Sequence, residues 1–460
     1  MNYLRRYVLI LLITVFTVCV CGTSMGQQKK QGRQNGHQKG HQGGQQDGQQ
    51  DGQQDGQQGG QQDEQEELLS GNVFTDSDRP FNVLLVDKST DSLYIAEVRD
   101  TSPGIAKKLS VLTGKNGGDK LKEGDRKTPE GIYFVTKYIS PEKLDRSLFG
   151  DGAYTLNYPN IVDRNKGKTG HGIWIHGRGP NRTDERTKGC VSLQNPDFQD
   201  IRPYVETDMP VVISSTLDFL NTKDYKKKRK VYFDIFKGFI SSWENGDFEG
   251  YASFFDTSFR GADGLSVKGY LDKKRLLMKS YPDRRVITSE VNIFTQNSTD
   301  LMYKFNQLYC AGNILSYGTK KLYLKVDKGK DRRIIAEEFE EADVNPLLKG
   351  YVLSLVEKWQ RSWQARDIEK YMDFYSQSFY SDGMNHKQWK AHKKGLFKGA
   401  GAINVDIRDI HITPLKSRKV QVSFKQRYSS GTVSDSGIKT LTLEGCPGEY
   451  KIVSEFWRAG

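Results

Sequence analysis

The run HGIWIHGRGPNRTDERTKGCVSLQNPD, residues 171–197, decides how the rest of the chain is interpreted. It places Cys190 fourteen residues after His176 and directly after Gly189. A thiol becomes a strong nucleophile only as a thiolate, and a neighbouring imidazole is the usual means of making one. Of the five cysteines, only Cys190 has both a glycine before it and a His-Gly step in the same run. The run therefore predicts a site for covalent acyl transfer.

The residues of this run predict how such a site would work. Residues 172–175 have a strand pattern that ends at His176, so its ring is expected to project from a rigid edge. Gly189 permits a sharp turn that exposes the Cys190 sulfur. We expect His176 to take the thiol proton and then to return a proton to the leaving amine. The N–H of Cys190 and the turn amides around Gly189 are expected to form the oxyanion site.

The N-terminal residues predict export. Arg5 and Arg6 precede an apolar run from Tyr7 to Cys21, and small residues follow it. We interpret residues 1–25 as a signal peptide or a retained signal anchor, because the apolar run is shorter than the ~20 residues of a spanning helix. The expected location is the periplasm or cell envelope, and a retained anchor would tether the chain to the inner membrane.

Residues 26–70 are rich in Gln, Gly and Asp, with DGQQ repeated from Asp47 onward. Such a segment cannot bury enough apolar surface to offset chain entropy, so we expect a disordered linker. Folded sequence is expected from near Phe81.

Charge and cysteine content limit the function classes. The formal net charge of +12 in an exported chain favours anionic wall or lipid surfaces over nucleic acid, and no nucleic-acid partner is expected. Beyond the signal, Cys310 and Cys446 are either two buried thiols or one disulfide. No CxxC, HExxH or His/Cys cluster occurs, so we expect no metal site and no cofactor.

Residues 78–220 are predicted to form a mostly β domain. The stretch FNVLLVDKSTDSLYIAEV, residues 81–98, predicts two strands joined by a polar turn at Lys88 to Asp91. Short strand-like segments broken by Gly and Pro continue to about Ser215. A basic connector, Asp224 to Lys230, is expected after this domain.

The rest of the chain is a duplication, with one copy over residues 228–342 and the other over 346–460. A shift of 120 residues aligns the aromatic residues Trp243, Tyr251, Phe254 and Phe259 with Trp363, Tyr371, Phe374 and Phe379. The same shift aligns Lys273 and Lys274 with Lys393 and Lys394, and a shift of 118 aligns the ends of the copies. Each copy opens with an amphipathic helical pattern and ends in strand-rich sequence. The pattern predicts two copies of one α+β domain.

The two copies resemble nuclear-transport-factor-like cones, in which helices pack on a curved antiparallel sheet. The resemblance rests on a Trp, an acidic or glycine turn, a Tyr and paired aromatics. We find no catalytic pair at matching positions in both copies. The cones are therefore interpreted as binding, positioning or dimerisation modules, through which cell-shape or envelope proteins could bind.

Residues 124–197 resemble the L,D-transpeptidase (YkuD-type) family of cell-wall cysteine enzymes. The resemblance is carried in family order by GDRKTPEGIYFV (124–135), LNYPNIVDR (156–164), GIWIHG (172–177) and TKGCVSLQNPD (187–197). The fold class expected for the whole chain is thus multidomain: a mostly-β YkuD-like catalytic domain plus two α+β cones. The resemblance implies peptidoglycan stem peptides as substrate, Cys190, His176 and Gly189 as catalytic residues, and attack on the L,D bond of a tetrapeptide stem.

Substrate contacts are expected beside this motif. The set comprises Gly177, Arg178, Arg186, Lys188 and Tyr158, and Arg182 lies in the same loop. The arginines and the lysine could pair with stem-peptide carboxylates. Gly177 is expected to leave room for the substrate backbone. His171 is expected on the opposite strand face, in a structural or rim role.

Two departures from the commoner family pattern leave the acyl acceptor open. Many members have Ser-His-Gly-Cys followed by Arg, whereas this chain has Thr187-Lys188-Gly189-Cys190 and then Ser192. The TKGC form resembles the subgroup with L,D-carboxypeptidases of helical cell shape. Water would make the enzyme an L,D-carboxypeptidase, and an amine would make it a transpeptidase. The alternative is a non-catalytic wall-binding scaffold that acts through the cones.

Overall fold

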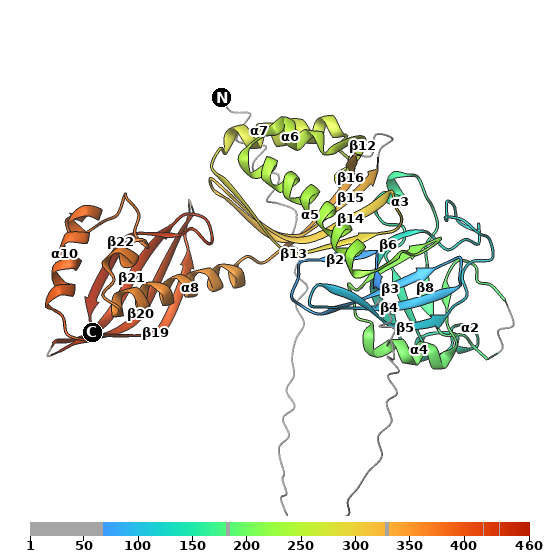
Figure 1. Cartoon of the computed structure of the whole chain (residues 1–460), viewed down its shortest axis with the longest axis horizontal. Helices are drawn as coiled ribbons and strands as arrows, with labels where there is room; N and C mark the ends of the chain where they lie inside the picture. The colour runs from blue at the N-terminus through green and yellow to red at the C-terminus, as the bar shows by residue number, and fades with distance from the viewer. Residues whose placement is uncertain (1–67, 181–184, 327–330, 417, 432) are drawn as a thin grey trace, which may run out of the picture. The chain divides into compact units, whose positions relative to one another are not determined.

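The computed structural model describes residues 68–180, 185–326, 331–416, 418–431 and 433–460 (Figure 1). The predicted signal segment 1–25, the linker up to residue 67 and Arg182 lie outside the described residues. Within the part of the chain that is described, no helix is long and apolar enough to cross a membrane.

A ten-stranded sheet forms the first body, in the order β11-β1-β5-β4-β3-β10-β6-β7-β8-β9. The strands are β1 (Leu69–Ser70), β3 (Phe81–Asp87), β4 (Ser92–Arg99), β5 (Ser102–Ser110), β6 (Gly131–Ile139), β7 (Ala153–Leu156), β8 (Trp174–His176), β9 (Val191–Ser192), β10 (Pro210–Ser214) and β11 (Phe219–Leu220). Short helices join them: η1 (Pro141–Lys143), α2 (Arg146–Phe149), α3 (Ile161–Asn165), α4 (Asn195–Ile201) and η2 (Arg202–Tyr204).

The first predicted hairpin is confirmed. β3 and β4 pair antiparallel from Phe81↔Val98 to Asp87↔Ser92, and the polar residues 88–91 form the turn. Asp87 accepts hydrogen bonds from the N–H groups of Ser89 and Thr90, which explains why this polar run reverses the chain. The strand β10 then lies parallel to β3 and antiparallel to β6, so the buried centre of the sheet is built from distant parts of the chain.

The predicted start of the folded sequence is wrong. Leu69 and Ser70, assigned to the linker, form β1, which pairs with β5 and β11. Val73–Thr75 forms β2, which joins the sheet of the next domain by pairing with β13. Phe74 makes this short strand stable, because its buried ring stacks on Tyr225 with centroids 5.0 Å apart.

The first copy of the duplication, which we call cone 1, is a helix-covered sheet. Its sheet has the order β12-β16-β15-β14-β13-β2. The elements are α5 (Thr222–Asn245), α6 (Phe248–Ser253), β12 (Phe255–Gly261), α7 (Val267–Ser280), β13 (Arg284–Thr295), β14 (Asp300–Ala311), β15 (Ile314–Val326) and β16 (Arg332–Ala342). The expected basic connector, residues 224–230, is instead inside α5, because Tyr225 is buried and anchors that turn.

The second copy, which we call cone 2, repeats this arrangement with fewer strands. A four-stranded sheet β19-β20-β21-β22 is accompanied by the separate pair β17-β18. The elements are α8 (Asn345–Gln364), α9 (Ile368–Met372), β17 (Tyr380–Ser381), β18 (Met384–Asn385), α10 (His386–Gly399), β19 (Ile403–Pro414), β20 (Lys419–Ser430), β21 (Val433–Glu444) and β22 (Lys451–Ala459). In each cone the helices cover one face of the sheet (Figure 1).

The predicted amphipathic helices are confirmed, and both break at the same point. α5 ends at Gly246, whose φ of 73° is left-handed, and α8 is followed by Arg366 at φ 57°. An aspartate then caps the next helix in each cone, Asp247 for α6 and Asp367 for α9. The break turns the chain so that both helices present aromatic residues to one core.

The sheet registers of the two cones match residue for residue. Phe294, Met302, Tyr323 and Ala336 form one row across cone 1, and Thr413, Gln421, Thr442 and Ser454 form the same row across cone 2. The same bulge interrupts β13 after Ser289 and β19 after Arg408. The duplication is therefore conserved in backbone detail and differs in side chains.

One predicted alignment between the copies needs a correction. Helix α7 starts after its cap Ser266, and α10 starts after its cap Asn385, which is a shift of 119 residues. Lys274 therefore corresponds to Lys393, which the shift of 120 pairs with Lys273. The loop before α10 is one residue shorter, and a one-residue error turns a helical side chain by about 100°.

A disulfide joins the cones. Cys310 of β14 is bonded to Cys446 in the loop between β21 and β22, which selects the disulfide from the two alternatives that the sequence left open. The ion pair Arg285–Glu449, at 3.2 Å, lies beside the same loop. Leu315 also packs on the core of cone 2.

Each cone also buries an ion cluster that the aromatic pattern did not predict. In cone 1, Lys320 Nζ lies 3.1 Å from Glu337, and Lys274 lies over the ring of Trp243. In cone 2, Lys439 Nζ lies 3.0 Å from Glu455. Lys393 completes that cluster over the ring of Trp389. Shifts of 119 for the lysines and 118 for the glutamates would have revealed this repeat in the sequence.

Candidate active site

Parallel pairing of β8 and β9 brings Cys190 and His176 to one sheet face. Ile175 pairs with Val191 and His176 with Ser192, so Cys190, directly before β9, is level with Trp174. Side chains alternate along a strand, so Cys190, Ser192, Trp174 and His176 project to the same side. Two residues fourteen positions apart in sequence thus become neighbours through strand register.

The imidazole of His176 is held in one orientation. Its Nδ1 lies 2.6 Å from the carbonyl oxygen of Gly177, and a carbonyl can only accept a hydrogen bond. Nδ1 therefore carries the proton, which leaves Nε2 as the basic nitrogen. The ring is 1% exposed, and Phe149 packs edge-to-face on it with centroids 5.1 Å apart. Phe149 contacts Trp174 as well, so this one ring supports the whole strand end.

The turn that presents Cys190 is fastened by Thr187. Its hydroxyl oxygen accepts a hydrogen bond from the Gly189 N–H at 3.0 Å and donates to the Cys190 carbonyl at 2.6 Å. Gly189 has φ 136°, and an added Cβ would lie 2.9 Å from the carbonyl oxygen of Lys127. Both the backbone angle and the close approach require glycine here.

This bond revises the predicted oxyanion site. The Gly189 amide is expected from the sequence to be among its donors, but it already donates to Thr187. The N–H of Cys190 remains the predicted donor.

Cys190 is partly exposed, and its sulfur contacts the backbone of Gly172, in the segment just before β8. Sγ lies 3.5 Å from the carbonyl oxygen of Gly172, in the geometry of a thiol donating a weak hydrogen bond. A thiolate has no proton to donate and would be repelled by that oxygen. Loss of the proton therefore favours rotation of the sulfur away from Gly172.

Asn195 explains two glycines near the site, and Ser147 explains a third. Its Oδ1 accepts a hydrogen bond from the Asp151 N–H at 3.1 Å. A Cβ added at Gly150 would lie 2.0 Å from that oxygen, and one at Gly177 would lie 2.5 Å from it. At Gly179 a Cβ would lie 1.9 Å from the carbonyl oxygen of Ser147. Gly177 is thus required by packing within the protein, whereas the sequence suggested space for a substrate.

Two predicted substrate-binding residues are engaged within the protein. The Arg186 guanidinium lies 2.6 Å from Asp91 and 3.3 Å from the Thr113 hydroxyl. Tyr158 is 5% exposed and belongs to the core, where its hydroxyl donates to the Thr169 carbonyl at 3.2 Å. Its buried position corrects the prediction, and its hydrogen bond supports the loop that leads to Gly172.

Lys188 and Arg178 stay beside the site. Lys188 is exposed on the turn between Thr187 and Gly189, and Arg178 is partly buried directly after Gly177. His171 is exposed one residue before Gly172.

The GDRKTPEG segment, residues 124–131, supports the cysteine turn through hydrogen bonds. Asp125 accepts hydrogen bonds from the amides of Leu121, Lys122 and Lys127, and its carboxylate lies 2.8 Å from Lys120 Nζ. Burial alone would raise the pKa of Asp125, but these donors hold it well below its usual range. Thr128 accepts from the Gly114 N–H, and the next residue, Lys115, donates its N–H to the Thr187 carbonyl. The motif therefore supports the turn that presents Cys190.

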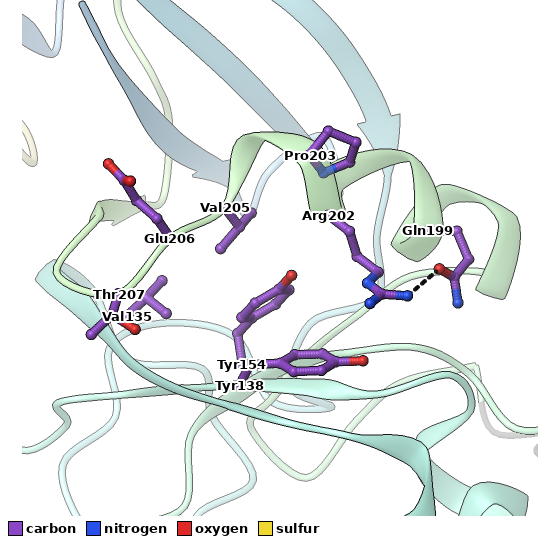
Figure 2. A pocket seen from close by; sticks show the side chains of 9 residues that line it. All are labelled: Val135, Tyr138, Tyr154, Gln199, Arg202, Pro203, Val205, Glu206 and Thr207. Carbon is purple, nitrogen blue, oxygen red and sulfur yellow. Dashed lines mark hydrogen bonds between the residues drawn. The ribbon is translucent and has the colours of Figure 1, made fainter. Parts of the chain in front are cut away.

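The cavity drawn in Figure 2 is on the other face of this sheet. It measures about 600 Å³, and Tyr138 and Tyr154 point into it (Figure 2). Tyr154 pairs with Ile175, one residue before His176, so strand alternation puts the cavity opposite the imidazole. Arg202 lies 5.3 Å from the ring centre of Tyr138. We therefore do not assign this cavity to the catalytic pair.

Residues 82–213 match the L,D-transpeptidase catalytic domain, YkuD. The chain has an L,D-transpeptidase catalytic domain. Residues 233–338 and 351–456 each match the Cds6 C-terminal NTF2-like domain, so two copies of it follow the catalytic domain. The predicted family and fold class are thereby confirmed.

Curated and solved relatives agree with this composition. The chain is 30% identical over 131 residues to the Escherichia coli (strain K12) protein named "Putative L,D-transpeptidase YafK". That alignment covers 28% of this chain and 47% of YafK, so the chain spans about half the length of the curated relatives it matches.

Two solved structures are similar over the catalytic domain and beyond it. Bd1075 of Bdellovibrio bacteriovorus is 29% identical with a TM-score of 0.54, covering 60% of this chain and 99% of that chain. A mutant of the helical cell shape determining protein Pgp2 of Campylobacter jejuni is 26% identical with a TM-score of 0.50, covering 60% and 94%. The similarity to a cell-shape protein supports the predicted subgroup.

The L,D-transpeptidase domain also contains site residues that sequence reasoning missed. Phe149 contacts His176, and Thr187 and the Gly172 carbonyl contact Cys190, yet sequence reasoning did not place them at the candidate site. Ser192, opposite His176 in register, is fully buried, and its hydroxyl has no hydrogen-bond partner among the described residues. In that same described part of the chain, no three His, Cys, Asp or Glu residues are grouped as metal ligands.

Proposed function

We propose that the protein is an exported peptidoglycan-modifying cysteine enzyme that forms an acyl-enzyme at the L,D bond of a tetrapeptide stem. The observation that supports this most is the parallel register of β8 and β9, which puts the Cys190 thiol and the His176 imidazole on one face. The match to the L,D-transpeptidase catalytic domain supplies the substrate class. The setting is the periplasm or cell envelope.

The proposed reaction has two halves. Nε2 of His176 takes the thiol proton, and Sγ of Cys190 attacks the carbonyl carbon on the L side of the scissile bond. The N–H of Cys190 stabilises the oxyanion of the tetrahedral intermediate. The imidazolium then gives its proton to the leaving nitrogen, D-Ala departs, and a thioester remains.

The second half regenerates the thiol. Water or a stem-peptide amine loses its proton to His176 and attacks the thioester, and the sulfur leaves and takes the proton back. Water gives an L,D-carboxypeptidase, and an amine gives a 3→3 crosslink. The Thr187-Lys188-Gly189-Cys190 form, which resembles the subgroup with L,D-carboxypeptidases, favours hydrolysis in this proposal.

Incubation of the full chain with purified disaccharide-tetrapeptides, followed by mass spectrometry, tests the proposal. We expect loss of one D-Ala for hydrolysis or a crosslinked dimer for transpeptidation. The Cys190→Ala variant should give neither product, and Lys188→Gln should keep most of the turnover if that cation only aids binding. Wild-type protein that behaves like Cys190→Ala would overturn the enzyme proposal and leave the wall-binding scaffold.

A further inference from the structure

The outward face of the cone 2 sheet carries a row of cations. Strand pairing aligns Arg408 of β19, Lys425 of β20, Ile438 of β21 and Arg458 of β22. All three cations are exposed. Since neighbouring strands are about 4.8 Å apart, the row extends over roughly 14 Å.

The alternation of side chains shows that this face points away from the core. Val422, Phe424 and Leu441 are buried in the cone 2 core, on the side that the helices cover. Residues between them, including Ser423 and Lys425, therefore project from the other side (Figure 1). The cations are exposed on this face.

The positive charge of this face is only partly balanced. Arg408 pairs with Asp406 and Lys425 with Asp409, each at 2.8 Å and exposed to water, where such pairs are weak. Arg458, and Arg427 in the next row, have no carboxylate within 4.0 Å in the described part of the chain. Phe456, in the row on the opposite side of the cation row from Arg427, is 62% exposed.

The row is absent from the matching face of cone 1. Its register equivalents are the neutral or acidic residues Ser289, Asn306, Thr319 and Glu340. The fold therefore does not require these cations, because the same backbone is built without them. On the same face of cone 1, the apolar row Phe294, Met302, Tyr323 and Ala336 packs against the catalytic domain. The register equivalents of that row in cone 2 are not buried by any part of the chain that the structure describes.

We propose that the outward sheet face of cone 2 binds an extended anionic strand of the cell wall. The inference rests on the proposed function for the nature of the partner. Carboxylates of successive stem peptides would pair with Arg408, Lys425 and Arg458, and the exposed ring of Phe456 would pack on a sugar face. Cations spread along a line suit a linear polyanion better than a single small anion, which needs donors that converge on one point.

Sedimentation of the full chain with purified sacculi tests this surface. Cys190→Ala is used as the background, so that bound wall is not processed. We expect the fourfold variant Arg408→Gln, Lys425→Gln, Arg427→Gln, Arg458→Gln to bind about tenfold more weakly or worse, and wild-type binding to fall with added salt. Circular dichroism checks that the variant is folded, which exposed substitutions should allow.

A matched control removes the same charge from the helical side of cone 2. Lys358→Gln, Lys387→Gln, Lys394→Gln and Lys398→Gln replace four exposed lysines of α8 and α10. This control should bind sacculi within about twofold of the background protein, since each exposed charge has only a small effect. Equal losses in both fourfold variants would overturn the proposal, as would no loss in the sheet-face variant.

Two further arms separate wall binding from lipid binding and from catalysis. If the sheet-face variant loses binding to phosphatidylglycerol vesicles but binds sacculi as well as the background protein does, the wall assignment is overturned in favour of lipid. With Cys190 intact, the sheet-face variant should process soluble muropeptides at the wild-type rate. Wild-type protein that binds sacculi through this face but never processes muropeptides would overturn the proposed enzyme and support the surface.

Discussion

The two cones share a backbone register, and their outward faces have opposite chemistry. In cone 1 the row Phe294, Met302, Tyr323 and Ala336 is buried in one cluster with catalytic-domain residues such as Val83 and Phe134. In cone 2 the same row is Thr413, Gln421, Thr442 and Ser454, none of which is buried. The outward face thus distinguishes a copy that docks within the chain from a copy that presents a surface.

The interiors of the cones have changed far less. Both retain two lysines and one glutamate that are buried or partly buried, Lys274, Lys320 and Glu337 in cone 1 and Lys393, Lys439 and Glu455 in cone 2. A buried ion cluster is costly unless its charges are paired, so a change to one member would leave the others uncompensated. The conserved interior and the divergent exterior lead to predictions that compare matched positions.

The largest expected difference comes from a charge placed in the outward row. Met302→Asp should lower the free energy of unfolding by about 4 kcal/mol, because a buried side chain is lost and an unpaired carboxylate replaces it. Gln421→Asp, its counterpart in cone 2, should change it by less than about 0.5 kcal/mol. Urea denaturation of the two variants measures the contrast. Similar losses would show that the cone 2 face is covered as well.

Removal of the central carboxylate should affect both cones alike. Glu337→Gln and Glu455→Gln each leave two lysines in a buried site, and we expect a loss of about 3 kcal/mol in either case. Hydrogen–deuterium exchange read by mass spectrometry assigns the loss to the altered cone. A large loss in one cone alone would mean that the repeated clusters are not equivalent.

The disulfide tests whether the cones depend on one another. Replacing Cys310 and Cys446 together by serine should cost about 2 kcal/mol, since the bond closes a loop of 136 residues in sequence. Exchange should increase in the 445–450 loop and at the end of β14, while muropeptide turnover stays unchanged. Faster exchange throughout cone 2 would show that it needs cone 1 in order to fold.

The smallest effect concerns pH. Burial, together with the neighbouring lysine, lowers the pKa of Lys274 and of Lys393 to about 8. Unfolded lysines keep their protons to higher pH, so the unfolded state binds more protons and stability should rise between pH 8 and 9.5 by up to about 1 kcal/mol per pH unit for each lysine.

The double variant Lys274→Met, Lys393→Met provides the control for this pH dependence. It should show a flatter profile when unfolding is measured at each pH. The window stops at pH 9.5, because burial raises the pKa of tyrosines such as Tyr251 and Tyr371. Unfolded tyrosines then lose protons first, which reverses the sign above pH 10. A slope that is unchanged in the double variant would contradict the assignment to these lysines.

Much of the fold could be predicted from the sequence because it depends on local residue patterns. The strands β3 and β4 and the helices α5 and α8 follow from alternation and amphipathic spacing. The strand β2 could not be predicted, since a pattern cannot be recognised in three residues. Its stability comes from Phe74, which packs on Tyr225, about 150 positions later in the chain. The predicted alignment of α7 with α10 was wrong because matching aromatic residues does not detect the one-residue deletion before α10.

The site was predictable to the extent that motif letters encode chemistry. Cys190, His176 and Gly189 were predicted from the motif, and the strand register gives a physical basis for the proximity of Cys190 and His176. Tyr158 was assigned to the substrate side because its burial depends on how the surrounding chain folds, which the motif does not show. Phe149 carries no titratable group, so only its contact with the imidazole identifies it.

The Cys310–Cys446 bond gives the thiol of Cys190 a practical property. Within residues 68–460 the other two cysteines are bonded to each other, so an oxidising compartment offers Cys190 no second thiol inside this region. Inactivation by oxidation would then proceed through sulfenic acid or a mixed disulfide with an outside thiol. Under non-reducing conditions, one equivalent of alkylating reagent taken up by this region therefore counts one reduced Cys190 thiol.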